Sequence, residues 1–255
     1  IQAISGKRPS SEPEIANQVH LTLQGKGGVG KSFVSSLVAQ YLRGKHRPVV
    51  VVDTDPVNAT LSGYKSLDVQ RLELMQDGTV NERNFDSLVL KILDEKDCNY
   101  VVDNGSASFV PLCHYIIENE TVQSIVDSGK EVFVHTVITG GSALMDTLIG
   151  FEALVNQMSD QVRIVVWLNE FLGKIESDGK TFEEMKVYQN NKHRIHRIVR
   201  ITQRTATTYG EDIKHMMESK MTFDEVNMSL KFNSIEKSRL FRVKKAIFDQ
   251  LEEVI

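Results

Sequence analysis

The chain has 255 residues, 41% of them hydrophobic, which is enough for one large α/β domain with a full core. Its formal net charge of −4 argues against a global basic field of the kind that attracts nucleic acid or an anionic membrane. Two cysteines and the lack of a membrane-length apolar run or signal-peptide pattern favour a soluble, cytoplasmic protein.

Residues 1–17 are polar, rich in turn-forming residues and without an apolar period. We expect a flexible N-terminal segment, or a remnant of processing or engineering, because the chain does not begin with Met. A single domain is expected over residues 18–255.

Residues 19–32 contain the first strong motif of the chain. Alternating apolar residues at 19–23 predict a strand, and apolar residues at helical spacing after residue 32 predict a helix. Between them, residues 25–32 form a complete Walker A motif, Gly-x-x-x-x-Gly-Lys-Ser. Its expected phosphate-binding residues are Gly25, Lys26, Gly27, Gly28, Val29, Gly30, Lys31, Ser32 and Phe33. Lys31 would supply charge to the β- and γ-phosphates, and the Ser32 hydroxyl would ligate Mg²⁺.

Two later strands are predicted to deliver carboxylates to the same edge of the sheet. After a first helix ending near Gly44, residues 49–52 are four valines that predict a buried parallel strand leading to Asp53 and Asp55. Residues 69–75 alternate and predict a short strand, and Asn81 or Asn84 is expected to cap the next helix. Residues 100–102 lead to Asp103 as in a Walker B motif, where the aspartate holds Mg²⁺ through water.

The next segments predict strand, helix and strand in turn. Residues 131–138 form an apolar strand in which His135 is expected to be a hydrogen-bonded core residue, and a helix should run to about Met158. Residues 162–168 predict a strand that ends at Asn169. A polar loop is expected at 170–180 and a helix near 181–191.

Residues 192–204 read as a basic strand. Such a cluster could neutralise DNA phosphates, but a charged edge strand protected against aggregation is the favoured interpretation. Residues 235–254 predict a helix with basic residues between its apolar positions. Docking on the sheet is favoured over a membrane-surface helix because Asp249, Glu252 and Glu253 oppose an anionic membrane.

The second lysine of the glycine loop carries a family resemblance. Residues 26–32, Lys-Gly-Gly-Val-Gly-Lys-Ser, resemble the deviant Walker A motif of the ParA/MinD family of P-loop ATPases. The resemblance implies an ATP-dependent homodimer in which Lys26 crosses to the partner's nucleotide. It also implies that Asp55 orients or deprotonates the attacking water, that Asn58 senses the γ-phosphate, and that Asn169 reads adenine. ATP and Mg²⁺ would be the ligands, and Lys26, Lys31 and Asp55 the catalytic residues.

A narrower resemblance comes from Gln24, from Asp103-Asn-Gly-Ser at 103–106, and from Phe-Val-Pro-Leu at 109–112. These residues are similar to the TraL-like branch of the family, with StbB-like proteins close by. The branch implies a bacterial, plasmid-encoded protein with a protein partner in the plasmid transfer machinery. Asn104 and Ser106 depart from the Asp-x-x-Pro or Asp-x-Gly-x-Gly of typical ParA proteins.

The expected fold is a mainly parallel, twisted α/β sheet with helices on both faces. The main functional hypothesis is a dimeric ATPase switch in conjugative DNA transfer or plasmid positioning. Two alternatives stay open: a metabolic P-loop enzyme similar to dethiobiotin synthetase, and a nucleotide-gated adaptor with vestigial hydrolysis. Cys98 and Cys113 are expected to be structural thiols rather than iron–sulfur ligands, because neither belongs to a C-x-x-C pair.

Overall fold

β1 (Gln18–Thr22) lies at the middle of a parallel sheet that organises the molecule. The computed structural model describes residues 17–255, so the predicted flexible segment lies outside the described residues except for Asn17. Within that range the large sheet has seven strands in the order β11-β8-β7-β1-β6-β2-β3, and every pairing is parallel. The other six strands are β2 (Val49–Asp53), β3 (Gln70–Arg71), β6 (Asn99–Asp103), β7 (Glu131–Thr139), β8 (Arg163–Asn169) and β11 (Ile195–Ile201).

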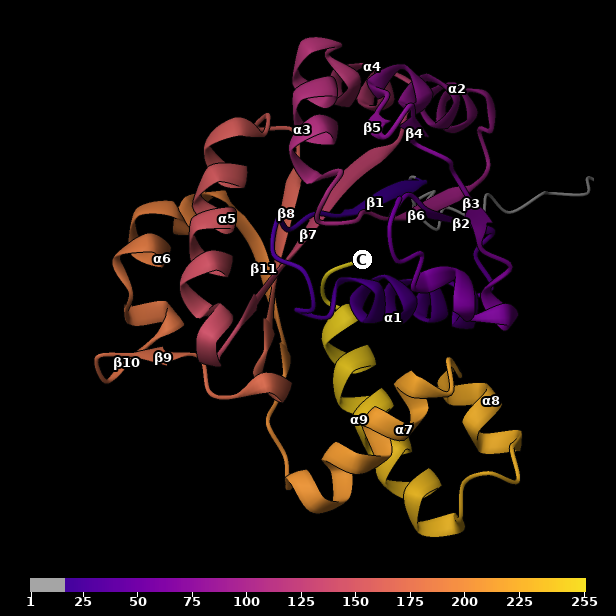
Figure 1. Ribbon diagram of the computed structural model, residues 1–255, viewed down its shortest axis with the longest axis vertical. Helices are drawn as coiled ribbons and strands as arrows, with labels where there is room; N and C mark the ends of the chain where they lie inside the picture. The colour runs from indigo at the N-terminus through magenta and orange to yellow at the C-terminus, as the bar shows by residue number, and fades with distance from the viewer. Residues whose placement is uncertain (1–16) are drawn as a thin grey trace, which may run out of the picture.

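The strands are apolar on both sides, so the sheet has a core on each face. Successive side chains point to opposite faces of a strand, and in β6 Tyr100 and Val102 join one hydrophobic cluster while Val101 joins the other. The first cluster is covered by α2 (Phe85–Asp94), α3 (Phe109–Glu118), α4 (Thr121–Asp127), α5 (Leu144–Gln157) and α6 (Lys186–Asn191). The second is covered by α1 (Lys31–Gly44), α7 (Glu211–Glu218), α8 (Phe223–Met228) and α9 (Ser234–Leu251). Figure 1 shows these two layers of helices on either side of the sheet. The predicted fold class is confirmed.

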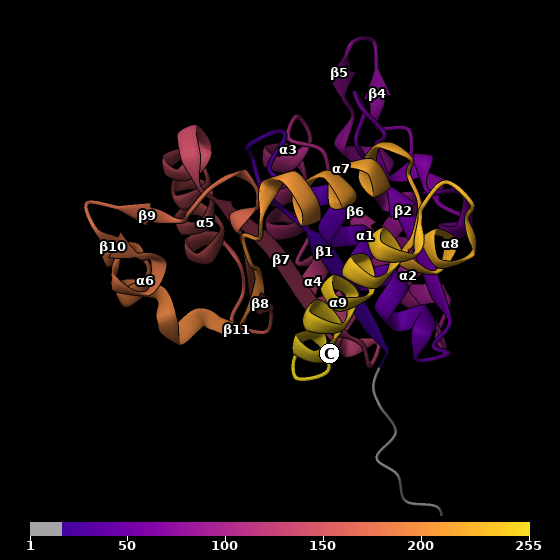
Figure 2. The same ribbon diagram turned by 90° about the horizontal axis from the view of Figure 1, so that it is seen from below.

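Two short hairpins were not predicted from the sequence. The predicted strand at 69–75 is divided between β3 at the edge of the sheet and β4 (Met75–Gln76), which pairs with β5 (Thr79–Val80). The predicted loop at 170–180 contains η5 (Glu170–Leu172) and the start of a second hairpin, β9 (Glu176–Ser177) with β10 (Lys180–Thr181). Figure 2 shows both hairpins projecting from the body of the molecule.

His135 is a hydrogen-bonded core residue, as predicted. Its Nδ1 accepts from the Trp167 indole at 2.9 Å, and its Nε2 lies 2.9 Å from Nδ1 of His20. His20 in turn lies 3.3 Å from the Gln18 side-chain oxygen. Since the indole can only donate, one direction fits the whole row: each neutral ring donates its Nε2 proton to the next acceptor. Burial lowers the pKa of His135 to about 3 and that of His20 well below its usual value.

β11 is an edge strand of the sheet, in agreement with the favoured interpretation of the basic segment. α9 packs against β11 and α1, so the predicted docking of this helix on the sheet is confirmed. Its Gln250 side chain accepts from the Arg200 backbone N–H at 2.8 Å and donates to the Arg200 carbonyl at 3.1 Å. Across residues 17–255, no helix combines the length and the apolar character needed to cross a bilayer.

Candidate functional site

The predicted site residues lie at the carboxyl ends of the adjacent strands β1, β6 and β2 and of β8, which is separated from β1 by β7. The glycine loop connects β1 to α1, Asp103 ends β6, Asp55 follows β2, and Asn169 ends β8. This is the edge at which open α/β sheets bind ligands. The structure therefore brings Walker A, Walker B and the second acidic motif together.

Two glycines of the loop have backbone angles that other residues rarely adopt. Gly28 has a φ of 74° and Gly30 a φ of 101°, which is the left-handed region that favours glycine. A Cβ on Gly30 would also lie 2.7 Å from the Asn169 amide nitrogen. The loop can therefore pass close to β8 only with glycine at this position.

Gln24 fixes the start of the loop to the neighbouring elements. Its buried side chain donates to the carbonyls of Val137 in β7 and Thr147 in α5, at 3.0 and 3.1 Å. Its oxygen accepts from the Lys26 backbone N–H at 3.4 Å. Sequence reasoning used Gln24 only as a mark of resemblance and assigned it no task. The structure shows a residue that positions the loop.

Lys31 begins α1 and is almost completely buried. Its ammonium donates to the Lys26 carbonyl at 2.9 Å. Desolvation lowers the pKa of Lys31, while the carboxylates of Asp103 and Asp55 act in the opposite direction. A buried ammonium at the positive end of a helix, after a glycine loop, is suited to bind phosphate. Phe33 packs its side chain into the core, so only its backbone can contribute to such binding.

Asp103 is buried beside the first turns of α1. Its carboxylate accepts from the Ser35 hydroxyl at 2.9 Å and from the hydroxyl of Ser32. Burial raises the pKa of Asp103 to about 7, even though these hydrogen bonds act in the opposite direction. A carboxylate and a serine hydroxyl are oxygen ligands of the kind that Mg²⁺ prefers, so Ser32 and Asp103 fit a magnesium site. Sequence reasoning missed Ser35, which lies one helical turn after Lys31.

Asp55 and Asp53 have different surroundings. The half-buried Asp55 accepts from the backbone N–H groups of Val57 and Asn58 at 2.9 and 3.1 Å, and a Cβ on Gly105 would lie 2.6 Å from its carboxylate. Asp53 is fully buried and accepts from Ser62 and from the Asp55 backbone. Asp53 is therefore committed to holding the turn, whereas the carboxylate of Asp55 acts electrostatically on Lys31 of the glycine loop. Asn58 is exposed.

Asn104, which departs from the motif of typical ParA proteins, forms buried hydrogen bonds. The Asn104 side-chain oxygen accepts from the hydroxyls of Thr54 and Ser108 at 3.1 and 2.8 Å. All three side chains are buried. They tie the end of β6 to the end of β2 and to the start of α3, which fixes Asp55 and Asp103 relative to one another.

Lys26 points away from its own loop. Its ammonium lies 2.7 Å from the carboxylate of Asp146 in the first turn of α5, and both side chains are about half exposed. An exposed ion pair of this kind contributes little to stability. Lys26 is therefore free to exchange this partner for another anion.

Asn169 supports the glycine loop. Its amide donates to the Val29 carbonyl at 2.9 Å, and its oxygen accepts from the Phe171 backbone N–H at 3.2 Å. One N–H and one lone pair of the amide remain for a ligand. Phe171, two residues further along the chain, lines a cavity of about 140 Å³ together with residues within 202–214.

The basic segment is partly neutralised within the fold. Arg194 pairs with Asp160, and Arg200 pairs with Glu183. Lys192, His193 and Arg197 are exposed. Fewer unpaired cations are therefore available than the sequence suggests, both for binding DNA phosphates and for protecting an edge strand against aggregation.

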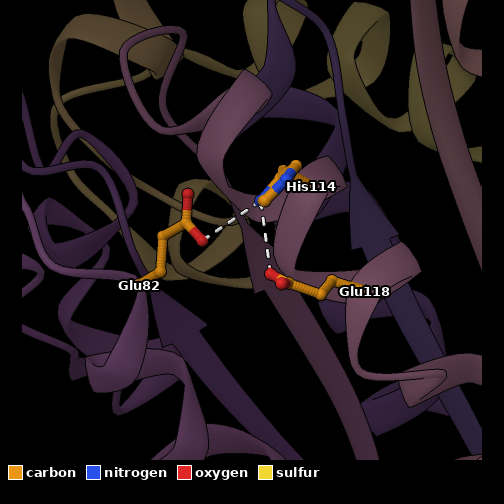
Figure 3. Close-up of side chains that lie close together, drawn as sticks. All are labelled: Glu82, His114 and Glu118. Carbon is orange, nitrogen blue, oxygen red and sulfur yellow. Dashed lines mark hydrogen bonds and ion pairs between the residues drawn. The ribbon is translucent and has the colours of Figure 1, made fainter.

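One further set of metal-ligating side chains lies on the surface (Figure 3). His114 Nδ1 lies 3.3 Å from the carboxylate of Glu82 and 3.7 Å from that of Glu118. His114 and Glu118 are one turn apart in α3, and Glu82 belongs to η3 (Glu82–Asn84). All three are wholly or partly exposed, and their contacts are those of a polar surface cluster that ties η3 to α3. Cys113 is buried in the core, which raises the pKa of its thiol to about 12, as befits a structural cysteine.

The sequence profile of the CobQ/CobB/MinD/ParA nucleotide binding domain matches residues 21–238. The chain belongs to this family. Within the family, the chain is 44% identical over 235 residues to a protein TraL of Escherichia coli, a match that covers 92% of this chain and 97% of that protein. A second protein TraL of Escherichia coli is 45% identical with the same coverage. The predicted ParA/MinD and TraL-like resemblance is confirmed.

Solved structures of the CobQ/CobB/MinD/ParA family share the fold. The MinC:MinD cell division protein complex of Aquifex aeolicus contains a chain with a TM-score of 0.54 and 14% identity, covering 93% of this chain and 95% of that chain. MinD of the same organism matches with a TM-score of 0.51, 14% identity and coverage of 93% and 96%. These matches show that the sheet and its helices have the arrangement of a P-loop nucleotide-binding domain.

Proposed function

We propose that the protein is an ATP-binding, Mg²⁺-dependent switch that dimerises with ATP and is released by hydrolysis. The observation that carries this proposal is the position of Lys26. A single phosphate cradle is complete with Lys31 and the loop N–H groups, yet the loop presents a second ammonium outward, held only by the exposed pair with Asp146. An outward lysine beside a phosphate site is suited to reach a phosphate held by a second copy.

The surface around Lys26 supports an interface at this edge. Val110, Met145 and Ile149 are 59–69% exposed. Val110 follows Phe109, whose ring would lie 3.2 Å from a Cβ on Gly25, and Met145 precedes the Asp146 that pairs with Lys26. Exposed apolar side chains gathered around a charged site are typical of an interaction surface. A second copy would cover them and complete the phosphate site.

Within this proposal each residue has a task. Lys31, the loop backbone and the backbone of Phe33 hold the phosphates, while Ser32 and Asp103 hold Mg²⁺, which neutralises phosphate charge when bound. Asp55 positions the attacking water, and Asn58 senses the γ-phosphate from the exposed turn after β2. The cavity lined by Phe171 is suited to the base, and Asn169 is assigned to its recognition.

The biological setting follows from the relatives rather than from the site. The resemblance to TraL proteins supports a role in conjugative plasmid transfer or plasmid positioning, in a bacterial cytoplasm, with a protein of the transfer machinery as partner. Exposed Lys192, His193 and Arg197 could add weak contacts to DNA phosphates.

The proposal is tested by the mass of the protein in solution with Mg²⁺ and a non-hydrolysable ATP analogue. Light scattering should give a monomer without nucleotide and a dimer with it. Lys26→Ala should bind ATP with unchanged affinity in calorimetry yet remain monomeric. Lys31→Ala should lose ATP binding altogether, because the charge that faces the phosphates is gone.

Lys186→Ala is the matched control, because Lys186 is an exposed lysine on α6 and its removal should leave both measurements unchanged. Dimerisation of Lys26→Ala to the same extent as the parent would contradict the assigned role of Lys26. ATP affinity that persists in Lys31→Ala would contradict the whole nucleotide site.

A further inference from the structure

A groove lies between α8 and α9, on the face of the molecule that α1 also covers. Its cavity is about 490 Å³. Phe223, Val226 and Leu240 form an apolar floor, and Phe241 forms part of the wall. Asp224, Lys237 and Lys244 add charged groups to its lining. The groove is thus apolar inside and charged along its sides.

Exposed apolar side chains also lie on α8, on α9 and on the segment between them. Met228, Leu230, Ile235 and Phe241 are 76%, 101%, 63% and 64% exposed, and all four fall within 14 residues of the chain. Large exposed apolar side chains concentrated in this way, with polar residues around them, are a mark of interaction sites. Phe241 belongs to the lining of the groove itself, and the other three lie on the same two helices or on the segment between them.

The charge of this region is opposite to that of the whole chain. Residues 223–245 contain six basic and three acidic residues, whereas the chain as a whole carries a net charge of −4. The three acidic side chains are occupied: Asp224 pairs with Lys244, Glu225 accepts from the Thr222 backbone, and Glu236 accepts from the Asn233 backbone. Lys231 and Lys237 have no ion-pair partner within residues 17–255. Arg239 pairs with Asp212, and Lys245 pairs with Asp249. The free positive charge that the region offers to a partner is therefore that of Lys231 and Lys237.

We propose that this groove is the docking site for an acidic amphipathic helix of a partner protein. The apolar face of such a helix fills the groove over Phe223 and Leu240, as in other helix-in-groove complexes. Its carboxylates pair with Lys237 and Lys231. A DNA backbone would have no use for the apolar floor. A flat membrane surface would not fill a concave groove, and the groove carries Asp224 in its lining.

The groove is separate from the nucleotide site. α8 is attached to α1 through the Phe223 backbone N–H, which donates to the Gln40 side chain at 2.9 Å. Gln40 lies nine residues beyond Lys31, or roughly 14 Å along the helix. Docking at the groove and phosphate binding at the loop can therefore be measured independently.

The test uses three fluorescein-labelled model peptides of 18 residues and fluorescence anisotropy. One forms an amphipathic helix with leucine on one face and glutamate on the other, one has lysine in place of glutamate, and one is a scrambled acidic sequence. We expect the acidic helix to bind at least 10-fold more tightly than either of the others. Phe241→Ser should weaken binding of the acidic helix at least 10-fold. Lys237→Glu should weaken binding of the acidic helix and strengthen binding of the basic helix.

The matched controls are Leu90→Ser, which removes an equally exposed apolar side chain from α2, and Lys186→Glu, which makes the same charge change on α6. Both should bind the acidic helix like the parent, and circular dichroism should show that all variants are folded. Equal affinity for the three peptides would overturn the proposal. So would binding to vesicles rich in phosphatidylserine that is lost in Phe241→Ser without any selectivity among peptides, since that result assigns the surface to a membrane.

Discussion

The carboxylates of Asp103 and Asp55 at the strand ends are held by different contacts, and we expect them to have different tasks. Asp103 is buried and receives serine hydroxyls, whereas Asp55 is half-buried and receives only backbone N–H groups of its own turn. A group fixed by a local turn can move with that turn. We therefore expect Asp103 to matter for the affinity of ATP with Mg²⁺ and Asp55 to matter for the chemical step.

Asp55→Ala should lower the rate of single-turnover ATP hydrolysis by about 100-fold or more, which is the usual contribution of a residue that acts on the attacking water. ATP affinity should stay close to that of the parent, because Asp55 is not assigned to the phosphates. The lifetime of the ATP-bound dimer should increase, since release is proposed to depend on hydrolysis. Equal turnover in the variant and the parent would remove Asp55 from the mechanism.

Asn169→Ala separates loop support from base recognition. The side chain is hydrogen-bonded to the Val29 carbonyl and the Phe171 N–H. Its removal should loosen the glycine loop and so lower the affinity for both ATP and GTP by about 10-fold. Its free N–H and lone pair are assigned to adenine, so the ratio of ATP to GTP affinity should also fall. Calorimetry with each nucleotide measures both effects. Unchanged affinities would show that neither contact matters for binding.

At the scale of the elements, the capping of α9 is a local signal with a measurable effect. The Asn233 side chain accepts from the N–H groups of Ile235 and Glu236, and Glu236 accepts from the Asn233 N–H in return. Asn233→Ala should lower the free energy of unfolding by about 1 kcal/mol in urea denaturation. Asn233→Ser keeps an oxygen at the cap and is the control. Its free energy of unfolding should stay within a few tenths of a kcal/mol of that of the parent. A loss of the same size in both variants would show that the cap is not the cause.

Strong periodicity and motifs made most elements predictable from the sequence. The valine run gave β2, the glycine loop fixed the junction of β1 and α1, and His135 in its apolar strand was correctly placed in the core. The hairpins were missed although each carries an Asp-Gly turn, at Asp77-Gly78 and Asp178-Gly179, with positive φ at both residues. That pair is the strongest short-range sign of a two-residue hairpin.

Other features could not be predicted because they depend on distant contacts. Gln24 reaches carbonyls more than 100 positions away, and Ser35 meets Asp103 across 68 residues. Asn104 looked like a departure from a family motif, and only the fold shows that it joins Thr54 to Ser108. Polar side chains of this kind have no period, so no window of sequence identifies their partners.

For the whole molecule, the buried histidines make stability depend on pH. The folded pKa of His135, about 3, lies below its ordinary value of 6.5, and His20 is lowered for the same reason. The unfolded chain therefore binds more protons below pH 6.5, so the stabilising contribution is complete above that pH and is lost as the pH falls. When the pH falls from 7.5 to 5.5, we expect His135 alone to lower the free energy of unfolding by about 1.4 kcal/mol.

Asp103 has the opposite effect on the pH dependence of stability. Its pKa of about 7 in the folded state makes the folded protein bind a proton as the pH falls, which raises the free energy of unfolding. The measurement is therefore urea denaturation at pH 7.5 and 5.5 in both the parent and Asp103→Asn. The variant should lose more stability on acidification than the parent. His193→Gln, which changes an exposed histidine, should behave like the parent. A variant that is equally stable at both pH values would contradict the assigned burial of the histidine pair.

The hydrogen bonds between Gln250 and Arg200 can form only late in the synthesis of the chain on the ribosome. Gln250 closes the open side of β11, but it lies 50 residues further along the chain. At about 5–20 residues per second, a ribosome needs several seconds to add those residues. During that interval the outer edge of β11 has no covering helix, and Arg197 and Arg200 are the protection that the strand carries against pairing with a neighbouring nascent chain. Those charges would then serve the protein during its synthesis, before it ever meets a nucleotide.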